Sequence, residues 1–330
     1  MNGRCFMGQV SKIAWTDATF NPWIGCTKVS EGCAHCYAEA QDKRWGHDSW
    51  GPGKPRRITT PEYWRQPLKW NKQAKESCVR KKVFCASLAD IFDEESPALP
   101  VDLISEYAFA VAGSVPFPSV RLMLFDLIER TEWLDWLLLT KRPERIPECL
   151  PQRWAKTLPR NVWLGTTTEN QKRFDERVHH LMKLRVRASV LFLSVEPQLG
   201  PIDIAGVLGG GRCSRGCVPS RDDNGCWICA GAGFNMAFAP AIDWVIVGGE
   251  SGGGARPFEI EWARSLQAQC ARNFVPFFMK QLGAKPMDVN IGGPVPYLGR
   301  FPIVSRKGDD MEEWPVDLRI QQFPIPRVIG

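Results

Sequence analysis

Three cysteines lie close together near the start of the chain, and their number and spacing constrain what the chain can build. Cys26, Cys33 and Cys36 are separated by six and then two residues, and Tyr37 follows them. A structural zinc site takes four closed ligands, whereas an iron–sulfur cube can be held by three thiolates that leave one iron open. The odd number of thiols therefore favours a catalytic iron–sulfur centre over a structural metal site.

The remaining composition narrows the class of protein. The chain has 12 cysteines and no apolar segment typical of a secretory signal, which favours metal ligation in a reducing compartment over disulfides. We therefore expect a cytoplasmic protein. No run of about 18 apolar residues occurs, so no membrane span is expected. A net charge of +6, from 42 basic and 36 acidic residues, is compatible with nucleic acid but too small to imply it.

Short apolar runs alternate along the chain with amphipathic segments, such as residues 171–184 and 260–273. Repeated strand–helix units predict a parallel sheet with crossover connections. About seven strands over this length favour an α/β fold that is a full or partial parallel βα barrel. The expected strands are nearly continuous apolar runs, as in strands buried on both faces, and cover residues 20–25, 83–87, 136–140, 162–166, 190–195, 244–249 and 276–280.

Polar or charged residues follow each expected strand. Loops are polar in any protein, but seven such strand ends in succession, with the cysteines after the first, predict one shared site. In parallel βα folds the loops after the strands carry the active site. The residues concerned are Cys26, Ser87, Asp90, Lys141, Arg142, Glu169, Asn170, Glu196, Glu250, Lys280 and Gln281.

A second group of cysteines interrupts the last strand–helix units. Four thiols in two close pairs, with glycines between them, fit a structural zinc knuckle, and a second iron–sulfur cluster or no metal are the alternatives. We therefore expect a barrel domain over residues 11–290, a cysteine-rich insertion over 208–240 within it, and a carboxyl-terminal extension over 291–330 that wraps the surface. The four cysteines are Cys213, Cys217, Cys226 and Cys229.

The first cysteine group resembles the cluster motif of radical S-adenosylmethionine (SAM) enzymes. In those enzymes three cysteines after the first strand of a partial βα barrel hold a [4Fe–4S] cluster, and SAM chelates the fourth iron. Their usual first gap is three residues and here it is six, whereas the second gap and the following aromatic agree. The resemblance implies that Cys26, Cys33 and Cys36 are the cluster ligands, that Tyr37 packs beside the cluster, and that an electron donor is needed.

The resemblance identifies SAM contacts only by their position at the carboxyl ends of the expected strands, and no sequence motif marks them. The Gly-Gly-Glu string that grips SAM in radical SAM enzymes should come after the second strand, and none follows residues 83–87. Gly248-Gly249-Glu250 lies near the sixth strand instead. The candidate SAM contacts at the carboxyl ends of the strands are Ser87, Asp90, Glu169, Asn170, Glu196 and Glu250.

A closer resemblance, from residue 11 to about residue 283, is to a family of uncharacterised phage and bacterial proteins known for the three-cysteine motif. By family association it implies a protein partner encoded nearby, and it implies no particular reaction. Besides the cysteines, the segments that carry it are residues 15–23, 139–145, 164–166 with 169–170, 194–197, and 248–252 with 255–257.

Basic residues at two strand ends are candidate substrate contacts. Lys141 and Arg142 suit a phosphate or carboxylate, although a charge cluster flanking a helix would have the same pattern. Arg256 follows three glycines, Gly252 to Gly254, which allow close approach of backbone to a phosphate.

The leading hypothesis is a radical SAM-type enzyme. An electron from the reduced cluster would break a carbon–sulfur bond of SAM, giving methionine and a 5′-deoxyadenosyl radical that takes hydrogen from the substrate. Charge, aromatic content and the phage resemblance suggest a nucleic-acid or nucleotide substrate, for modification or repair. One alternative is a non-catalytic, metal-stapled protein that binds nucleic acid or a partner, with His35 closing the first site on zinc. The other is an iron–sulfur redox protein that does not use SAM.

Overall fold

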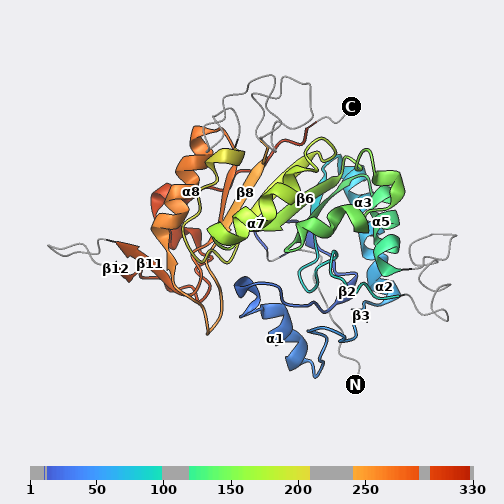
Figure 1. Ribbon diagram of the computed structural model, residues 1–330, viewed down its shortest axis with the longest axis horizontal. Helices are drawn as coiled ribbons and strands as arrows, with labels where there is room; N and C mark the ends of the chain where they lie inside the picture. Colours follow the sequence, from blue (N-terminus) through green and yellow to red (C-terminus); the bar gives the residue numbers. More distant parts are fainter. Residues whose placement is uncertain (1–10, 12, 99–118, 209–240, 290–297, 328–330) are drawn as a thin grey trace. The chain divides into compact units, whose positions relative to one another are not determined.

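The computed structural model describes residues 11, 13–98, 119–208, 241–289 and 298–327 (Figure 1). The chain divides into two compact units. Among the described residues, those up to 164 and residues 187–189 belong to the first unit, and residues 165–186 and those from 190 to 327 belong to the second. The cysteine-rich insertion, with Cys213, Cys217, Cys226 and Cys229, lies outside the described residues.

A seven-stranded sheet with the order β1-β4-β5-β6-β7-β8-β10 forms the core of the fold. The pairs β1–β4 and β4–β5 in the first unit, and β7–β8 and β8–β10 in the second, are parallel. This sequential order is that of a βα barrel, and over the described residues it ends at β1 and β10 without closing. The strands are β1 Ala18–Thr19, β4 Lys81–Cys85, β5 Leu134–Thr140, β6 Val162–Thr167, β7 Val190–Val195, β8 Trp244–Gly248 and β10 Phe277–Gln281.

The predicted α/β class with a parallel sheet is confirmed, and six of the seven expected strands agree with the structure to within two residues. The exception is the run 20–25, which is not one strand. β1 ends before it, and β2 (Trp23–Ile24) pairs in antiparallel fashion with β3 (Arg57–Ile58). Pro22 has no N–H for a ladder, and the Asn21 Oδ1 atom accepts a hydrogen bond from the Leu88 N–H at 2.7 Å. The chain therefore turns at this point toward the loop that follows β4.

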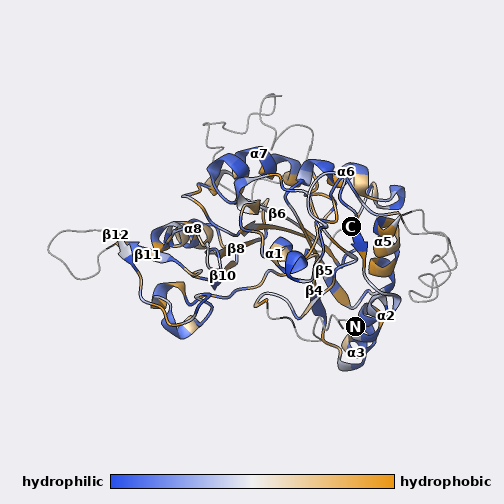
Figure 2. Ribbon diagram, turned by 90° about the horizontal axis from the view of Figure 1, so that it is seen from below, coloured by the Kyte–Doolittle hydropathy of each residue, from blue (hydrophilic) through white to orange (hydrophobic). Residues whose placement is uncertain are grey.

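The helices of the first unit cover the sheet through apolar faces. Pro67, Trp70 and Ala74 are the buried positions of α3, a spacing typical of a helix with one face inward, and α3 contacts β4 and β5. α5 is largely hydrophobic in Figure 2, and six of its 11 residues are buried. The α-helices are α1 Tyr37–Arg44, α2 Pro61–Trp64, α3 Gln66–Ser77, α5 Val120–Arg130 and α6 Ile146–Cys149; the 3-10 helices are η1 Glu31–Cys33, η3 Pro143–Arg145 and η4 Gln152–Trp154.

The second unit contains the two helices that periodicity predicts. α7 (Gln171–Met182) is capped by Asn170, whose side chain accepts from the Arg173 N–H at 3.0 Å, a typical helix cap. Its hydrophilic outer face is visible in Figure 2. The other elements are α8 Ile260–Arg272, a small sheet of β9 Phe258–Glu259, β11 Pro286–Val289 and β12 Leu298–Arg300, and the 3-10 helices η5 Ala205–Val207, η6 Met311–Glu313 and η7 Val316–Leu318.

The carboxyl-terminal segment packs into the second unit rather than only covering its surface. Gln321 forms an antiparallel bridge with Phe278 of β10, and the ring of Phe323 lies 5.5 Å from that of Trp244. The segment therefore extends the edge of the sheet. Within the described ranges, no helix has the length and apolar character needed to cross a membrane.

Candidate functional site

The cysteine loop follows β2 and begins beside the carboxyl ends of β1 and β4. Backbone contacts between Gly25 and the loop after β4 hold it there. The Gly25 N–H donates to the Leu88 carbonyl at 3.0 Å, and Gly25 has a φ of 121°. A Cβ atom at Gly25 would lie 2.4 Å from the Ser49 carbonyl oxygen, so only glycine fits this turn. Cys26 then forms a backbone bridge with Trp50.

Two of the three cysteines meet on one apolar surface. Cys26 and Cys36 pack against the same cluster, which consists of Ile24, Ala38, Trp50 and Leu88. Cys33 ends η1, where its sulfur lies 3.7 Å from the Ser30 Oγ atom. All three are half-buried free thiols, and they follow one another along the segment between β2 and α1.

The surroundings raise the pKa of the Cys26 thiol and lower that of the Cys33 thiol. Burial, followed by the charge of Asp90, raises the pKa of the Cys26 thiol to about 12, although Arg142 acts against this. Burial also acts to raise the pKa of Cys33, but the charge of Lys141 and local hydrogen bonds outweigh it, so that its pKa is lowered. In the metal-free protein, Cys33 is therefore a better source of thiolate than Cys26.

Arg142 connects the first cysteine to the loops after β4 and β5. Its Nη1 atom lies 3.8 Å from the Cys26 sulfur and donates to Asp90 at 3.1 Å. Its Nη2 atom donates to the Thr27 carbonyl at 2.6 Å and lies 3.2 Å from Asp93. The side chain is only 5% exposed. Arg142, proposed from the sequence as a substrate contact, thus has its guanidinium engaged inside the protein.

Asp90, a candidate SAM contact, is likewise surrounded by internal donors. Its carboxylate accepts from the Thr140 hydroxyl at 2.8 Å, from the Lys141 N–H at 3.1 Å and from the Phe92 N–H at 3.0 Å. Together with the Arg142 contact these bonds tie the ends of β4 and β5 to each other. The geometry gives Asp90 a positioning role.

Ser87, after β4, and Tyr37, at the start of α1, contact each other next to the cysteine loop. The Asn21 Nδ2 atom donates to the Ser87 hydroxyl at 3.1 Å, and the Tyr37 hydroxyl donates to the Ser87 carbonyl at 2.8 Å. Tyr37 remains 56% exposed. The structure therefore ties the start of α1 to the loop after β4 through Tyr37.

Sequence reasoning missed Arg56. Residues 45–57 are rich in glycine, proline and basic residues, a composition typical of a surface loop, but Arg56 is buried. Its Nη2 atom donates to the Thr27 hydroxyl at 2.7 Å and to Asp93 at 2.8 Å. Arg56 is buried because it pairs with the buried Asp93, which lies 37 residues away along the chain. No local pattern in the sequence signals this partner.

In the second unit, each predicted acidic site residue has a basic partner of its own. Glu169 is fully buried and pairs with Arg177 at 2.6 Å, and Asn170 caps α7. The predicted substrate contact Arg256 pairs with the predicted SAM contact Glu250, its Nη2 atom lying 2.7 Å from the Glu250 Oε1 atom.

Glu196 pairs with Lys280 across the end of an intervening strand. Glu196 follows β7 and Lys280 lies in β10, and β8 stands between these strands in the sheet order. β8 ends in Gly248, where an added Cβ atom would make ordinary contacts of 3.4 Å with the Glu196 and Gln281 Cγ atoms. Lys280 is thus a further polar residue of this sheet edge.

A match to a known family covers both of these regions. The model of a family described as protein of unknown function (DUF5131) matches residues 10–307. The chain belongs to this family. No curated protein and no solved structure matches the chain. The expected membership of an uncharacterised family is therefore confirmed, and the match assigns no reaction to the family's members.

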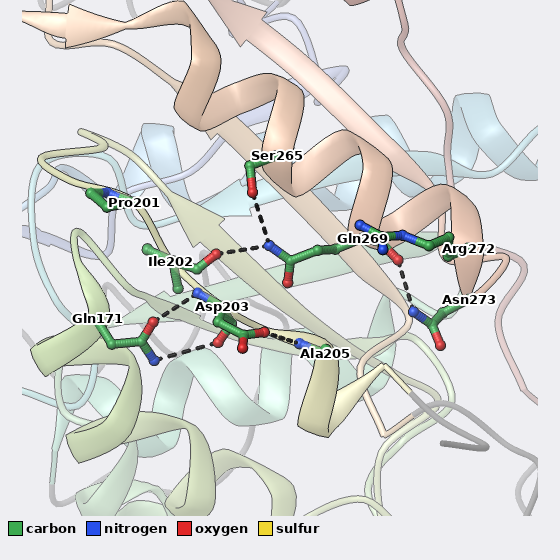
Figure 3. A pocket seen from close by; sticks show the side chains of 9 residues that line it. All are labelled: Gln171, Pro201, Ile202, Asp203, Ala205, Ser265, Gln269, Arg272 and Asn273. Atoms are coloured by element: carbon green, nitrogen blue, oxygen red, sulfur yellow. Dashed lines mark hydrogen bonds between the residues drawn. The ribbon is translucent and has the colours of Figure 1, made fainter. Parts of the chain in front are cut away.

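A pocket of about 870 Å³ lies in the second unit of this family member, between the start of α7, residues 201–205 and α8 (Figure 3). The side-chain amides of two glutamines form hydrogen bonds with the backbone of residues 202–204, which line or adjoin the pocket. Gln171 accepts from the Asp203 N–H at 2.7 Å, and Gln269 accepts from the Ile204 N–H at 2.7 Å and donates to the Ile202 carbonyl at 2.9 Å. The pocket contains none of the site residues predicted from the sequence.

The donor chemistry of the cysteine loop fits an iron–sulfur cluster. Such clusters are held by cysteine thiolates, and cations such as Arg142 and Lys141 beside the sulfurs favour the thiolate form. Among the residues that the structure describes, however, no three His, Cys, Asp or Glu side chains are arranged so that they could hold a metal ion. The role of Cys26, Cys33 and Cys36 as ligands therefore remains a prediction.

Proposed function

We propose that the protein is a radical SAM-type iron–sulfur enzyme in which Cys26, Cys33 and Cys36 hold a [4Fe–4S] cluster. The observation that carries the proposal is the position of the cysteine loop at the carboxyl ends of β1 and β4. In parallel βα folds this edge is where active sites assemble. When bound, the cluster would supply an electron for cleavage of SAM and so start hydrogen abstraction from the substrate.

The chain's own residues would prepare this site. Lys141 lowers the pKa of Cys33, and Arg142 places a guanidinium next to the Cys26 sulfur. The apolar cluster under Cys26 and Cys36 would limit the access of water to the sulfurs. Ser87 remains the proposed SAM contact of the first unit, where Asp90 has the positioning role described above. Glu169, Asn170, Glu196 and Glu250 of the second unit stay candidates from the sequence alone.

The proposed nucleic-acid or nucleotide substrate is supported by an uneven charge distribution. Residues 61–82, which include α3, contain seven basic and two acidic side chains, a net charge of +5 compared with +6 for the whole chain. Lys69, Lys72 and Lys75 are exposed along α3. A row of exposed lysines on one helix is suited to phosphate groups.

Anaerobic reconstitution with iron and sulfide, followed by electron paramagnetic resonance spectra with and without SAM, tests the proposal. We expect a brown protein whose reduced signal changes when SAM is added. A cluster that is indifferent to SAM would identify the redox alternative. A colourless protein that binds two zinc ions per chain would identify the metal-stapled binding protein, with one zinc at Cys213, Cys217, Cys226 and Cys229.

A separate measurement tests the nucleic-acid part. Fluorescence anisotropy with a labelled single-stranded oligonucleotide should show salt-dependent binding. Changing Lys69, Lys72 and Lys75 to Gln should reduce the slope of log affinity against log salt by about 2 to 3, because each lost phosphate contact removes roughly 0.7 to 0.9 from it. Unchanged binding by this variant would exclude α3 as the contact surface.

A further inference from the structure

Two buried arginines hold one residue of the cysteine loop from two sides. Arg142 donates to the carbonyl of Thr27 at 2.6 Å, and Arg56 donates to its hydroxyl at 2.7 Å. Both side chains are at most 5% exposed. Thr27 directly follows Cys26, so the two arginines determine where the first cysteine sits.

The arginines are themselves held by two buried carboxylates. Asp93 bonds to Arg56 at 2.8 Å and to Arg142 at 3.2 Å, while Asp90 bonds to Arg142 at 3.1 Å. Taking four charges out of water is expensive, and well-packed apolar residues would often give equal or greater stability. A network of this kind is better explained by the position that it imposes on Thr27 and Cys26 than by stability alone.

The same geometry places the Arg142 guanidinium next to sulfur, where its charge offsets those of Asp90 and Asp93. The Arg142 Nη1 atom lies 3.8 Å from the Cys26 sulfur. On reduction, an iron–sulfur cluster gains one electron and thus one negative charge. A nearby cation and an N–H donor to a ligand sulfur stabilise that reduced form, so they raise the reduction potential.

We propose that Arg56 and Arg142 are positioning residues that hold the Cys26–Thr27 turn, and that Arg142 also raises the reduction potential of the cluster. The second half of this proposal rests on the proposed function. The first half concerns the metal-free chain, so the two can be tested separately.

Hydrogen exchange of the metal-free protein tests the positioning role. The variant Thr27→Val removes the hydroxyl that Arg56 contacts and leaves all four buried charges in place. We expect faster amide exchange in peptides covering residues 24–37 for Thr27→Val, and a greater increase for Arg142→Gln. Arg177→Gln, which breaks the Arg177–Glu169 pair of the second unit, is the matched control and should leave exchange in residues 24–37 unchanged. Unchanged exchange in both Thr27→Val and Arg142→Gln would overturn the positioning role.

Potentiometric titration of the reconstituted protein tests the effect on the cluster. Arg142→Gln should lower the midpoint potential by about 59 mV, equivalent to a tenfold change in the ratio of reduced to oxidised cluster for one electron. Arg142→Lys, which retains the charge, should restore most of this shift, and Thr27→Val should not cause it. If Arg142→Gln does not fold, Arg142→Lys should still show a smaller shift in the same direction, because its ammonium group cannot reproduce the two-sided contact.

The outcomes separate the two proposals. If the wild-type chain binds no cluster while Thr27→Val still loosens residues 24–37, the proposed function and the redox role fall and the positioning role stands. If the wild-type chain binds a cluster whose potential is the same in Arg142→Gln and Arg142→Lys as in the wild type, the proposed function stands and the redox role of Arg142 is overturned.

Discussion

The strand ends of the two units carry similar residues but organise them differently. In the first unit, Asp90 and Asp93 share two arginines in one buried network around the Cys26–Thr27 turn. In the second unit, each predicted site carboxylate has its own cation, as in the Glu196–Lys280 pair, whose members are 18% and 20% exposed. Polar residues after strands can thus converge on one point or form separate pairs. The first arrangement makes each member depend on the others, and the second does not.

Removal of a cysteine ligand in the first unit should have the largest effect, with no equivalent effect in the second unit. We expect Cys26→Ser to abolish cluster binding, because a hydroxyl is a poor replacement for a thiolate ligand of iron. Glu250→Gln in the second unit should leave iron content unchanged, and Cys78→Ser, at an exposed cysteine, is the control. Iron and sulfide analysis after reconstitution measures the effect. Full iron content in Cys26→Ser would show that this cysteine is not a ligand.

Removal of one buried charge should distinguish the two units by stability. Asp93→Ala leaves two arginines without a shared partner in an interior site, so we expect a loss of about 3–5 kcal/mol in the free energy of unfolding. Glu196→Gln should cost less than about 1 kcal/mol, because partly exposed ion pairs contribute little. Urea unfolding of the metal-free proteins measures both. Equal losses would mean that the second unit's pair is as interdependent as the first unit's network.

Substitution of one glycine in each unit should give smaller differences in stability between the units. Gly25→Ala forces a Cβ atom to 2.4 Å from the Ser49 carbonyl oxygen at a φ of 121°, so a loss of about 1–3 kcal/mol is expected. At Gly248 the nearest contacts are side-chain carbons at 3.4 Å. Gly248→Ala should therefore be tolerated better, with Glu196 and Gln281 shifting slightly. Thermal or urea unfolding measures the stability of both variants. A greater loss in Gly248→Ala than in Gly25→Ala would contradict the expectation.

The smallest expected effect concerns the reactivity of the thiols. Only the thiolate reacts with iodoacetamide. Since the pKa of Cys33 is lowered and that of Cys26 is raised to about 12, Cys33 should be labelled first as pH rises, and Cys26 should resist labelling until strongly alkaline pH. Lys141→Met should slow the labelling of Cys33 several-fold at neutral pH, because the pKa of Cys33 rises when the Lys141 charge is removed. Peptide mapping by mass spectrometry follows each cysteine, and faster labelling of Cys26 than of Cys33 would contradict the expectation.

The sheet could be predicted from the sequence because burial on both faces produces continuous apolar runs. The run 190–195 coincides with β7, and the helical periodicities at 171–184 and 260–273 correspond to α7 and α8. The run 20–25 could not be predicted in this way. Its hydrophobicity is that of a strand, but β1 ends before it, and with Asn21 and Pro22 at its start only β2 (Trp23–Ile24) lies within it.

Which residues follow the strands, and that three thiols share one loop, can be predicted from the order of residues along the chain. What those residues contact depends on the folded structure. Arg56 reaches Thr27 from 29 residues away, and Arg142 reaches Cys26 from 116 residues away. Hydrophobic periodicity records whether a position is buried, but the partner of a buried charge depends on which loops the folded sheet brings together.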